Sequence, residues 1–389
     1  MPTRMPFRVM ALTSALLLAA APAMAGPLQP PPGYLQPAGS KPGAASPCPA
    51  APKPFTGTLA FQSKYEGSGK ARDTLNPDAE KAYKAKTQPI TAMEKGLVSR
   101  VKKYQRSGNA ADLQCAVQWL SSWATAKDGA VTGAMLGEAT NHTGKSLRKW
   151  SLGTFASAWV RLKFSASNGV GAYPEDRRRI ERWLSAMADQ VVTEWSPDDP
   201  IDKINNHYYW AAWALMATSV AVDRRDLFDR SLLLFRVFEK QIDADGYLPN
   251  EMKRATRAAG YHNYAMAPLA MIAAFAKANG VDLASEGVVG GRSALTRLAQ
   301  LSETALDDPA SFADKAGAEQ DTATLDSSSS SRAWLEPYCW TVRCTPREEA
   351  TRDASRPLGS TRLGGDLTSI FATAAAGAAS GNPMHEEQP

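Results

Sequence analysis

The sequence predicts a mostly helical protein in which apolar inner helices are covered by an outer layer of helices. Two observations carry this prediction. Helix-period apolar patterns recur from about residue 78 onward and are separated by short polar breaks, and no useful β-branched alternating run appears. Several helical stretches are apolar on nearly all sides, which is typical of buried helices. A stacked solenoid is the competing architecture, but no repeat of fixed period is visible.

The first 25 residues have the pattern of a secretory signal peptide. Arg4 and Arg8 form a positive start, the apolar stretch VMALTSALLLAAA is too short to span a bilayer, and the small residues AMA precede Gly26. We therefore expect cleavage after Ala25 and export of the mature chain. No other apolar run approaches the roughly 20 residues of a membrane helix, so we expect no membrane insertion.

Composition divides the mature chain into three parts. Residues 26–54 are rich in Pro, Gly, Ala and Ser, which predicts an extended arm, and the small, polar residues 373–389 predict a disordered tail. The helical domain therefore occupies residues 55–372. The formal net charge is +5, and removal of the two signal-peptide arginines leaves +3 (5 − 2). This near balance argues against nucleic acid as a partner.

Within this domain the apolar periodicity places helices in succession. Ser146 is a plausible N-cap, Pro174 stands at a first helical position before acidic residues, and Asn279 with Gly280 ends a helix. The segment 208–222 is apolar on nearly all sides and should be buried. The expected helices span residues 112–126, 146–164, 174–195, 208–222, 225–243 and 264–278.

The four cysteines indicate disulfide bonds, because their number is even and the chain is exported. Four cysteines allow three connectivities. Cys339 and Cys344 are close enough in sequence to close a small loop, which leaves Cys48 to pair with Cys115 and to pin the end of the arm. A metal site is the weaker alternative, since no C-x2-C pair is present and the histidines are scattered.

Four short segments combine polar groups of the kind used in catalysis with nearby aromatic residues. They are SKYEGS at 63–68, NHTGKS at 141–146, INNHYYW at 204–210 and NEMKRATRAAGYHNYA at 250–265. Three of the four histidines, His142, His207 and His262, lie in them. Helix entrances expose backbone N–H groups and favour anions. Taken singly, a histidine at a helix start is more commonly a cap or a satisfied polar residue.

These segments, together with WLEPYC at 334–339, resemble motifs of the periplasmic alginate lyases of the alginate biosynthesis machinery, and they occur in the same order over residues 54–367. The resemblance implies an incomplete α/α toroid with a deep substrate groove. It also implies a periplasmic enzyme that cleaves the 1→4 bond of mannuronate-rich alginate by β-elimination and leaves an unsaturated uronate at the non-reducing end. The alginate export complex is the protein partner that it suggests.

The resemblance assigns the chemistry to four residues. Removal of the C5 proton puts extra charge on the uronate carboxylate, and Asn206, His207 and Arg254 are expected to surround that group with donors. Tyr261 is expected to protonate the leaving O4 and, on mannuronate, also to take the C5 proton as tyrosinate. His207 is the alternative base, with a reference pKa of ~6.5 against ~10 for tyrosine. No cofactor and no metal are expected.

The substrate itself is an anionic polysaccharide, and six further motif residues are expected to hold it: Ser63, Lys64, Tyr65, His142, Thr143 and Arg343. Trp210 is either a sugar platform or a core residue. Two other functions stay open. A glycoside hydrolase on a similar toroid needs two positioned carboxylates, and Glu66 and Glu251 have no evident pairing. A non-catalytic alginate-binding protein of the export complex would keep Lys64 but tolerate loss of Tyr261.

Overall fold

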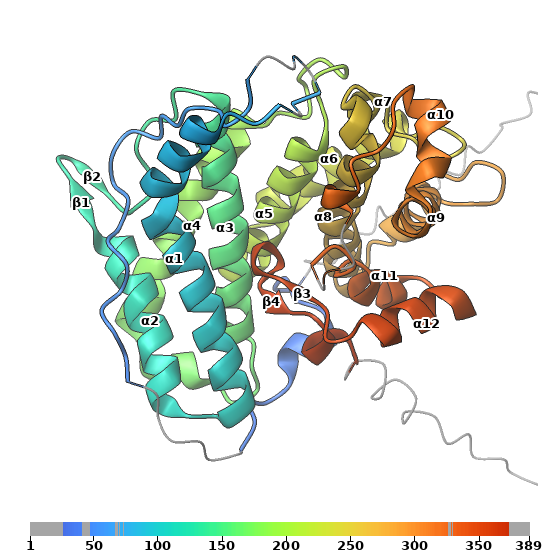
Figure 1. Ribbon diagram of the computed structural model, residues 1–389. Coiled ribbons are helices and arrows are strands. Elements are labelled where there is room, and N and C mark those ends of the chain that lie inside the picture. Colours follow the sequence, from blue (N-terminus) through green and yellow to red (C-terminus); the bar gives the residue numbers. More distant parts are fainter. Residues whose placement is uncertain are drawn as a thin grey trace, which may run out of the picture.

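The computed structural model describes residues 26–40, 47–66, 69, 71–72, 74–325, 328 and 330–372, so the predicted signal peptide and tail lie outside the described residues. Helices dominate the fold (Figure 1). The helices are α1 (Pro77–Ser107), α2 (Ala110–Thr125), α3 (His142–Lys163), α4 (Pro174–Glu194), α5 (Asn206–Val222), α6 (Arg225–Gln241), α7 (Pro249–Met252), α8 (Ala258–Ala278), α9 (Ala294–Asp307), α10 (Ala313–Ala316), α11 (Leu335–Thr341) and α12 (Pro346–Ser355). The strands form two short antiparallel pairs, β1 (Lys127–Asp128) with β2 (Val131–Thr132) and β3 (Gly359–Ser360) with β4 (Gly365–Asp366).

The helices form two layers, as predicted. Helices α1, α3, α5, α8 and α11 contact one another in succession and form the inner layer, while α2, α4, α6 and α9 pack against it (Figure 1). Nearly every residue of α5 and α8 is buried, because both helices are rich in alanine and aromatic residues and meet neighbours on all sides. Helix α4 instead buries one face, at Ile180, Leu184, Met187 and Val191.

The start of α3 differs from the prediction. Asn141, rather than Ser146, is the N-cap: its Oδ1 accepts the backbone N–H of Gly144 at 2.9 Å. Both residue types favour this position, and the Asn141 amide in addition donates to the carbonyl of Phe61 at 3.1 Å. Ser146 therefore lies one turn inside the helix, where its hydroxyl reaches the imidazole of His207.

The described part of the arm packs on the helices. Tyr34 lies in a 3-10 helix (Pro32–Leu35) and is 1% exposed. Further along, the indole N–H of Trp119 donates to the carbonyl of Pro49 at 3.0 Å, and that of Trp123 donates to the carbonyl of Pro52 at 2.9 Å. The proline-rich segment, which cannot complete a helix of its own, thus satisfies buried indole groups of α2.

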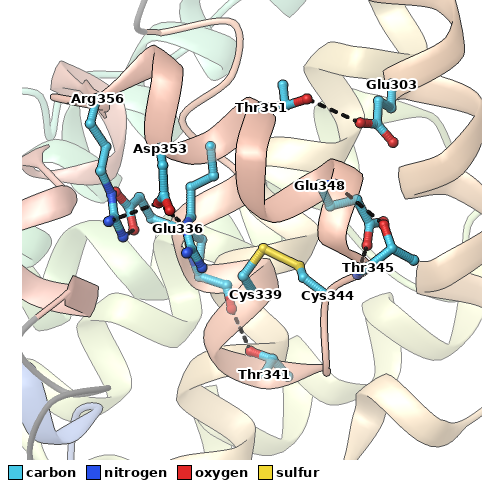
Figure 2. The surroundings of a disulfide bond; sticks show 12 residues. Glu303, Glu336, Cys339, Thr341, Cys344, Thr345, Glu348, Thr351, Asp353 and Arg356 are labelled. Atoms are coloured by element: carbon cyan, nitrogen blue, oxygen red, sulfur yellow. Dashed lines mark hydrogen bonds and ion pairs between the residues drawn. A yellow bond between two sulfur atoms is a disulfide. The ribbon is translucent and has the colours of Figure 1, made fainter.

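Two disulfides have the predicted connectivity. Cys48 is bonded to Cys115 and ties the arm to α2, and Cys339 is bonded to Cys344 across the turn between α11 and α12. Figure 2 shows the second disulfide beside Thr345, the residue that caps α12 through a capping box. The crosslink and the cap together fix the short connection between these two helices.

Removing the long-range disulfide should cost more stability than removing the local one. The entropy that a crosslink removes from the unfolded chain grows with the loop that it closes, and the sequence separations are 67 residues for Cys48–Cys115 and 5 for Cys339–Cys344. Serine replacement of the first pair should lower the free energy of unfolding by about 4 kcal/mol, and of the second by about 2 kcal/mol. Urea unfolding measures both, and a larger loss for the short loop would contradict the loop argument.

Candidate active site

A cavity of about 390 Å³ is formed by the starts of α3, α5 and α8, the segment before α1 and the 3-10 helix Thr361–Leu363. Eight of the ten site residues predicted from the sequence line it; the exceptions are Arg254 and Arg343. The full lining is Ser63, Lys64, Tyr65, Arg72, Tyr83, His142, Thr143, Ser146, Trp150, Asn206, His207, Arg257, Gly260, Tyr261, Tyr264 and Arg362.

The two asparagines at the start of α5 serve two separate tasks. Asn205 is the N-cap, and its side chain accepts the backbone N–H of His207 at 3.0 Å. Asn206 is fully buried and donates to the carboxylate of Glu251, from its backbone N–H at 2.5 Å and from Nδ2 at 3.0 Å. Burial raises the pKa of Glu251, while Arg254 and these hydrogen bonds lower it. The contact fixes the Asn206 amide in the cavity wall.

The imidazole of His207 is held between aromatic rings. It stacks on the indole of Trp195 with ring centres 5.8 Å apart, lies 5.8 Å from Trp150 and meets His142 edge-on at 4.5 Å. Burial lowers the pKa of His207 well below its usual value, and nearby cations add to the effect. Desolvation lowers the pKa of His142 to about 4 in the same way. Both rings are therefore neutral at pH 7.

Tyr261 lies in the first turn of α8 beneath two guanidinium groups. The guanidinium carbon of Arg254 is 4.6 Å from the centre of its ring, and that of Arg257 is 5.1 Å away. Burial raises the pKa of Tyr261, and the two arginines oppose this without reversing it. The phenol is therefore protonated at neutral pH, which suits a proton donor. Arg254 is 8% exposed and lies outside the cavity lining.

The segment before α1 closes one side of the cavity. Tyr65 forms an isolated antiparallel bridge with Leu75, and Ser63 accepts the backbone N–H of Tyr65 at 3.2 Å. Arg257 joins this segment to the start of α8, because its Nη1 donates to the carbonyl of Arg72 at 2.7 Å and its guanidinium carbon lies 5.1 Å from the Tyr65 ring centre. The guanidinium of Arg257 is thus equally close to the rings of Tyr65 and Tyr261.

All formal charges in the lining are positive. Lys64, Arg72, Arg257 and Arg362 line the cavity, and the described residues place no Asp or Glu there. The first turns of α3 and α5 add partial positive charge through their backbone N–H groups. Such a cavity attracts a polyanion. Over the described ranges, no group of three or more His, Cys, Asp or Glu side chains is placed to hold a metal ion.

Several residues around the cavity were not identified from the sequence. Arg362 lies 4.0 Å above the ring centre of Trp150 and donates to the hydroxyl of Tyr264. Ser146 and Lys149 of α3 reach the imidazole at the start of α5. Both residues follow His142 at helical spacing, so they lie on the same face of α3. This spacing could have identified them from the sequence. No sequence pattern identifies Arg362, because the residues that it contacts are far from it in the sequence.

The structure corrects the placement of Arg343. This side chain is exposed beyond the end of α11 and is not part of the cavity lining. For Trp210 the core interpretation holds, since it is 3% exposed and its ring centre lies 4.9 Å from that of Tyr264. His262 is a satisfied core residue, whose Nε2 accepts the backbone N–H of Leu248 at 2.7 Å.

Comparison with known proteins agrees with these features. A family model described as alginate lyase matches residues 60–312. The alginate lyase of Pseudomonas aeruginosa is 48% identical over 358 residues, which cover 92% of this chain and 94% of that protein. The alginate lyase of Azotobacter vinelandii is 48% identical over 361 residues, which cover 92% of this chain and 93% of that protein.

Solved structures show the same fold at lower identity. The crystal structure of alginate lyase A1-III from Sphingomonas species A1 matches with a TM-score of 0.68 at 23% identity, covering 86% of this chain and 89% of that one. A variant of alginate lyase A1-III complexed with a tetrasaccharide matches with a TM-score of 0.68 at 24% identity, covering 83% and 85%. The predicted α/α toroid is thereby confirmed. With the family model and the close relatives, these findings show that the chain belongs to the alginate lyase family.

Proposed function

We propose that this chain cleaves mannuronate-rich alginate by β-elimination, with Asn206, His207, Arg254 and Tyr261 as the groups that act on the uronate. The observation that carries the proposal is the cavity itself. It combines two neutral imidazoles, a protonated phenol and four cationic side chains, and its described lining contains no carboxylate. This inventory fits a reaction that develops negative charge on a substrate that is already anionic.

The uronate carboxylate is assigned to the start of α5. The Asn206 amide nitrogen donates to both carboxylate oxygens of Glu251 at 3.0 Å, which holds this amide beside the proposed carboxylate position. His207 presents a neutral ring beside it. Arg254 is assigned the positive charge next to this position, although its Nε lies 3.9 Å from the carboxylate of Glu251 and it stands outside the cavity lining. Donors that are already in place lower the barrier to forming the enolate-like dianion after loss of the C5 proton.

The proton transfers are assigned to Tyr261. In mannuronate the C5 hydrogen and O4 lie on the same side of the C4–C5 bond, so one group can serve both. The tyrosinate removes the C5 proton, the C4–C5 double bond forms, the C4–O4 bond breaks, and the regenerated phenol protonates O4. In guluronate the two groups lie on opposite sides, which disfavours this arrangement. The raised pKa of Tyr261 makes the ionised form scarce at neutral pH, and Arg254 and Arg257 stabilise it.

Two other functions fit the structure less well. A glycoside hydrolase needs a pair of carboxylates at the scissile bond. Among the described residues, Glu251 is fully buried and bonded to Asn206, and Glu66 is exposed outside the lining. A non-catalytic binding protein would explain the cationic lining but not the enclosure of Tyr261 by Arg254 and Arg257.

A product assay tests the proposal. The purified chain should release products with the ultraviolet absorbance of an unsaturated uronate from polymannuronate, roughly tenfold or more faster than from polyguluronate. Equal rates on the two polymers would overturn the mannuronate preference. New reducing ends without absorbance would indicate hydrolysis, and binding without either signal would indicate the non-catalytic function.

We infer that the mature chain acts in the periplasm with the alginate export complex as its partner. The signal-peptide pattern of residues 1–25 supports export, and disulfide bonds form in oxidising compartments. Across the described ranges, every helix is too short or too polar to cross a membrane. Cell fractionation and co-purification from crosslinked periplasm test the inference, and retention in the cytoplasm would contradict it.

A further inference from the structure

Lys149, a fully buried lysine of α3, has no task in the scheme above. Its Nζ lies 3.0 Å from Nδ1 of His207 and 3.4 Å from the ring centre of Trp195. The ion pairs of the described residues do not include Lys149: Glu194, whose charge acts on this ammonium, is paired with Arg148. A buried lysine is costly without a partner. The indole face and the imidazole nitrogen are thus its nearest polar or electron-rich neighbours.

The contact constrains the tautomer of His207. A lysine ammonium has three N–H donors and no acceptor, so the nitrogen that it meets must accept. A neutral imidazole has one donor and one acceptor nitrogen, and His207 is neutral. If Nδ1 accepts, the ring proton is on Nε2. The hydroxyl of Ser146, 3.2 Å from the same Nδ1, is also able to donate to it.

A flipped imidazole would keep the same ring plane but place Cδ2 instead of Nδ1 against Lys149 and Ser146, so that neither contact would have a ring nitrogen. The planes of His207 and Trp195 differ by 10°, and Trp150 covers the ring at 34°. The polar side-chain contacts of the ring in the described part of the chain are both made at Nδ1. Because the residue lines the cavity, Nε2 is the nitrogen that a ligand can reach.

We propose that Lys149 is a positioning residue that donates to Nδ1 of His207 and so holds the Nε2–H tautomer toward the substrate. His207 then offers the uronate carboxylate a hydrogen-bond donor rather than a lone pair, and removal of the C5 proton falls to Tyr261. This inference rests on the proposed function, because it specifies how one of the assigned groups works.

Burial and the charge of Arg362 lower the pKa of Lys149. The donor role survives loss of the proton, since a neutral amine keeps two N–H bonds. One of them can face the electron-rich ring of Trp195, which repels a lone pair, and leave the other to donate to Nδ1 of His207. The hydroxyl of Ser146 is compatible with this tautomer, because it can donate to the same nitrogen.

Nitrogen NMR of the full chain labelled with ¹⁵N-histidine tests the tautomer directly, with the His207→Gln variant identifying the signals. In the unsubstituted protein, Nε2 of His207 should be protonated and Nδ1 should be an acceptor. A proton on Nδ1 would overturn the inference. The NMR measurement does not require turnover, so it separates the two proposals. If the chain cleaves polymannuronate but carries the proton on Nδ1, only the inference about Lys149 is refuted. If the chain cleaves neither polymer, the proposed function is refuted.

The Lys149→Met variant keeps the apolar stem and removes the donor. Its kcat on polymannuronate should fall about 10- to 100-fold with little change in KM, and the Nε2–H signal should weaken in favour of Nδ1–H. Lys145→Met is the matched control, because it removes the same charge one turn earlier in α3 and should leave both readouts unchanged. An unchanged tautomer and kcat in a folded Lys149→Met variant would contradict the inference.

Discussion

Replacing Tyr261 by phenylalanine should reduce kcat on polymannuronate by about 10³-fold or more and leave affinity for the polymer nearly unchanged. The hydroxyl is assigned both to the C5 proton and to O4, and each acid–base role is worth about 10²–10⁴-fold. The aromatic ring beneath Arg254 and Arg257 remains in place. Steady-state kinetics from product absorbance, with calorimetric binding of an oligomannuronate, separate the loss of turnover from any loss of binding.

Tyr264 provides a matched control for this experiment. It also lines the cavity, its ring centre is 6.5 Å from that of Tyr261, and its hydroxyl accepts a hydrogen bond from Arg362. The Tyr264→Phe variant removes one hydroxyl from the same helix and should retain activity within about 10- to 100-fold, the scale of a hydrogen bond to a charged group. Turnover that survives in Tyr261→Phe, or an equal loss in both variants, would remove the special role of Tyr261.

The layered helical fold could be predicted because apolar periodicity reports burial directly. Residues 208–222 are apolar on all sides, and they form most of α5, which is almost entirely buried. Helix starts are less well determined by sequence. Asparagine and serine both cap helices, and α3 begins after Asn141 because that side chain also bonds to the backbone at Phe61. That bond depends on tertiary structure.

The site could be predicted only as far as the motifs extend. Asn206, His207 and Tyr261 lie in short polar segments at helix starts, and the fold brings them to one cavity. Lys149 lies inside a helix and becomes notable only because its Nζ meets Nδ1 of His207. Arg362 reaches the cavity from the far end of the chain, so no local pattern marks it.

Replacing Arg254 by alanine should lower kcat/KM on polymannuronate by about 10²–10³-fold, the usual effect of losing one donor at a developing charge. Two effects of the substitution contribute to this loss. The variant removes the cation that pairs with Glu251 next to the proposed carboxylate position, and it removes one of two cations that lower the pKa of Tyr261. Arg257, with its guanidinium carbon 5.1 Å from the ring centre, then stabilises the tyrosinate alone.

The pH profile distinguishes this double role from a simple loss of binding. With a raised pKa, Tyr261 is mostly protonated at neutral pH, so kcat/KM should increase with pH as the tyrosinate forms. Without Arg254 the pKa rises further, and the increasing limb should move to higher pH. Arg343→Ala, which removes an exposed arginine outside the cavity, should leave the curve where it is. A uniform drop in Arg254→Ala with no shift along the pH axis would mean that Arg254 only binds the polymer and that the base is another group.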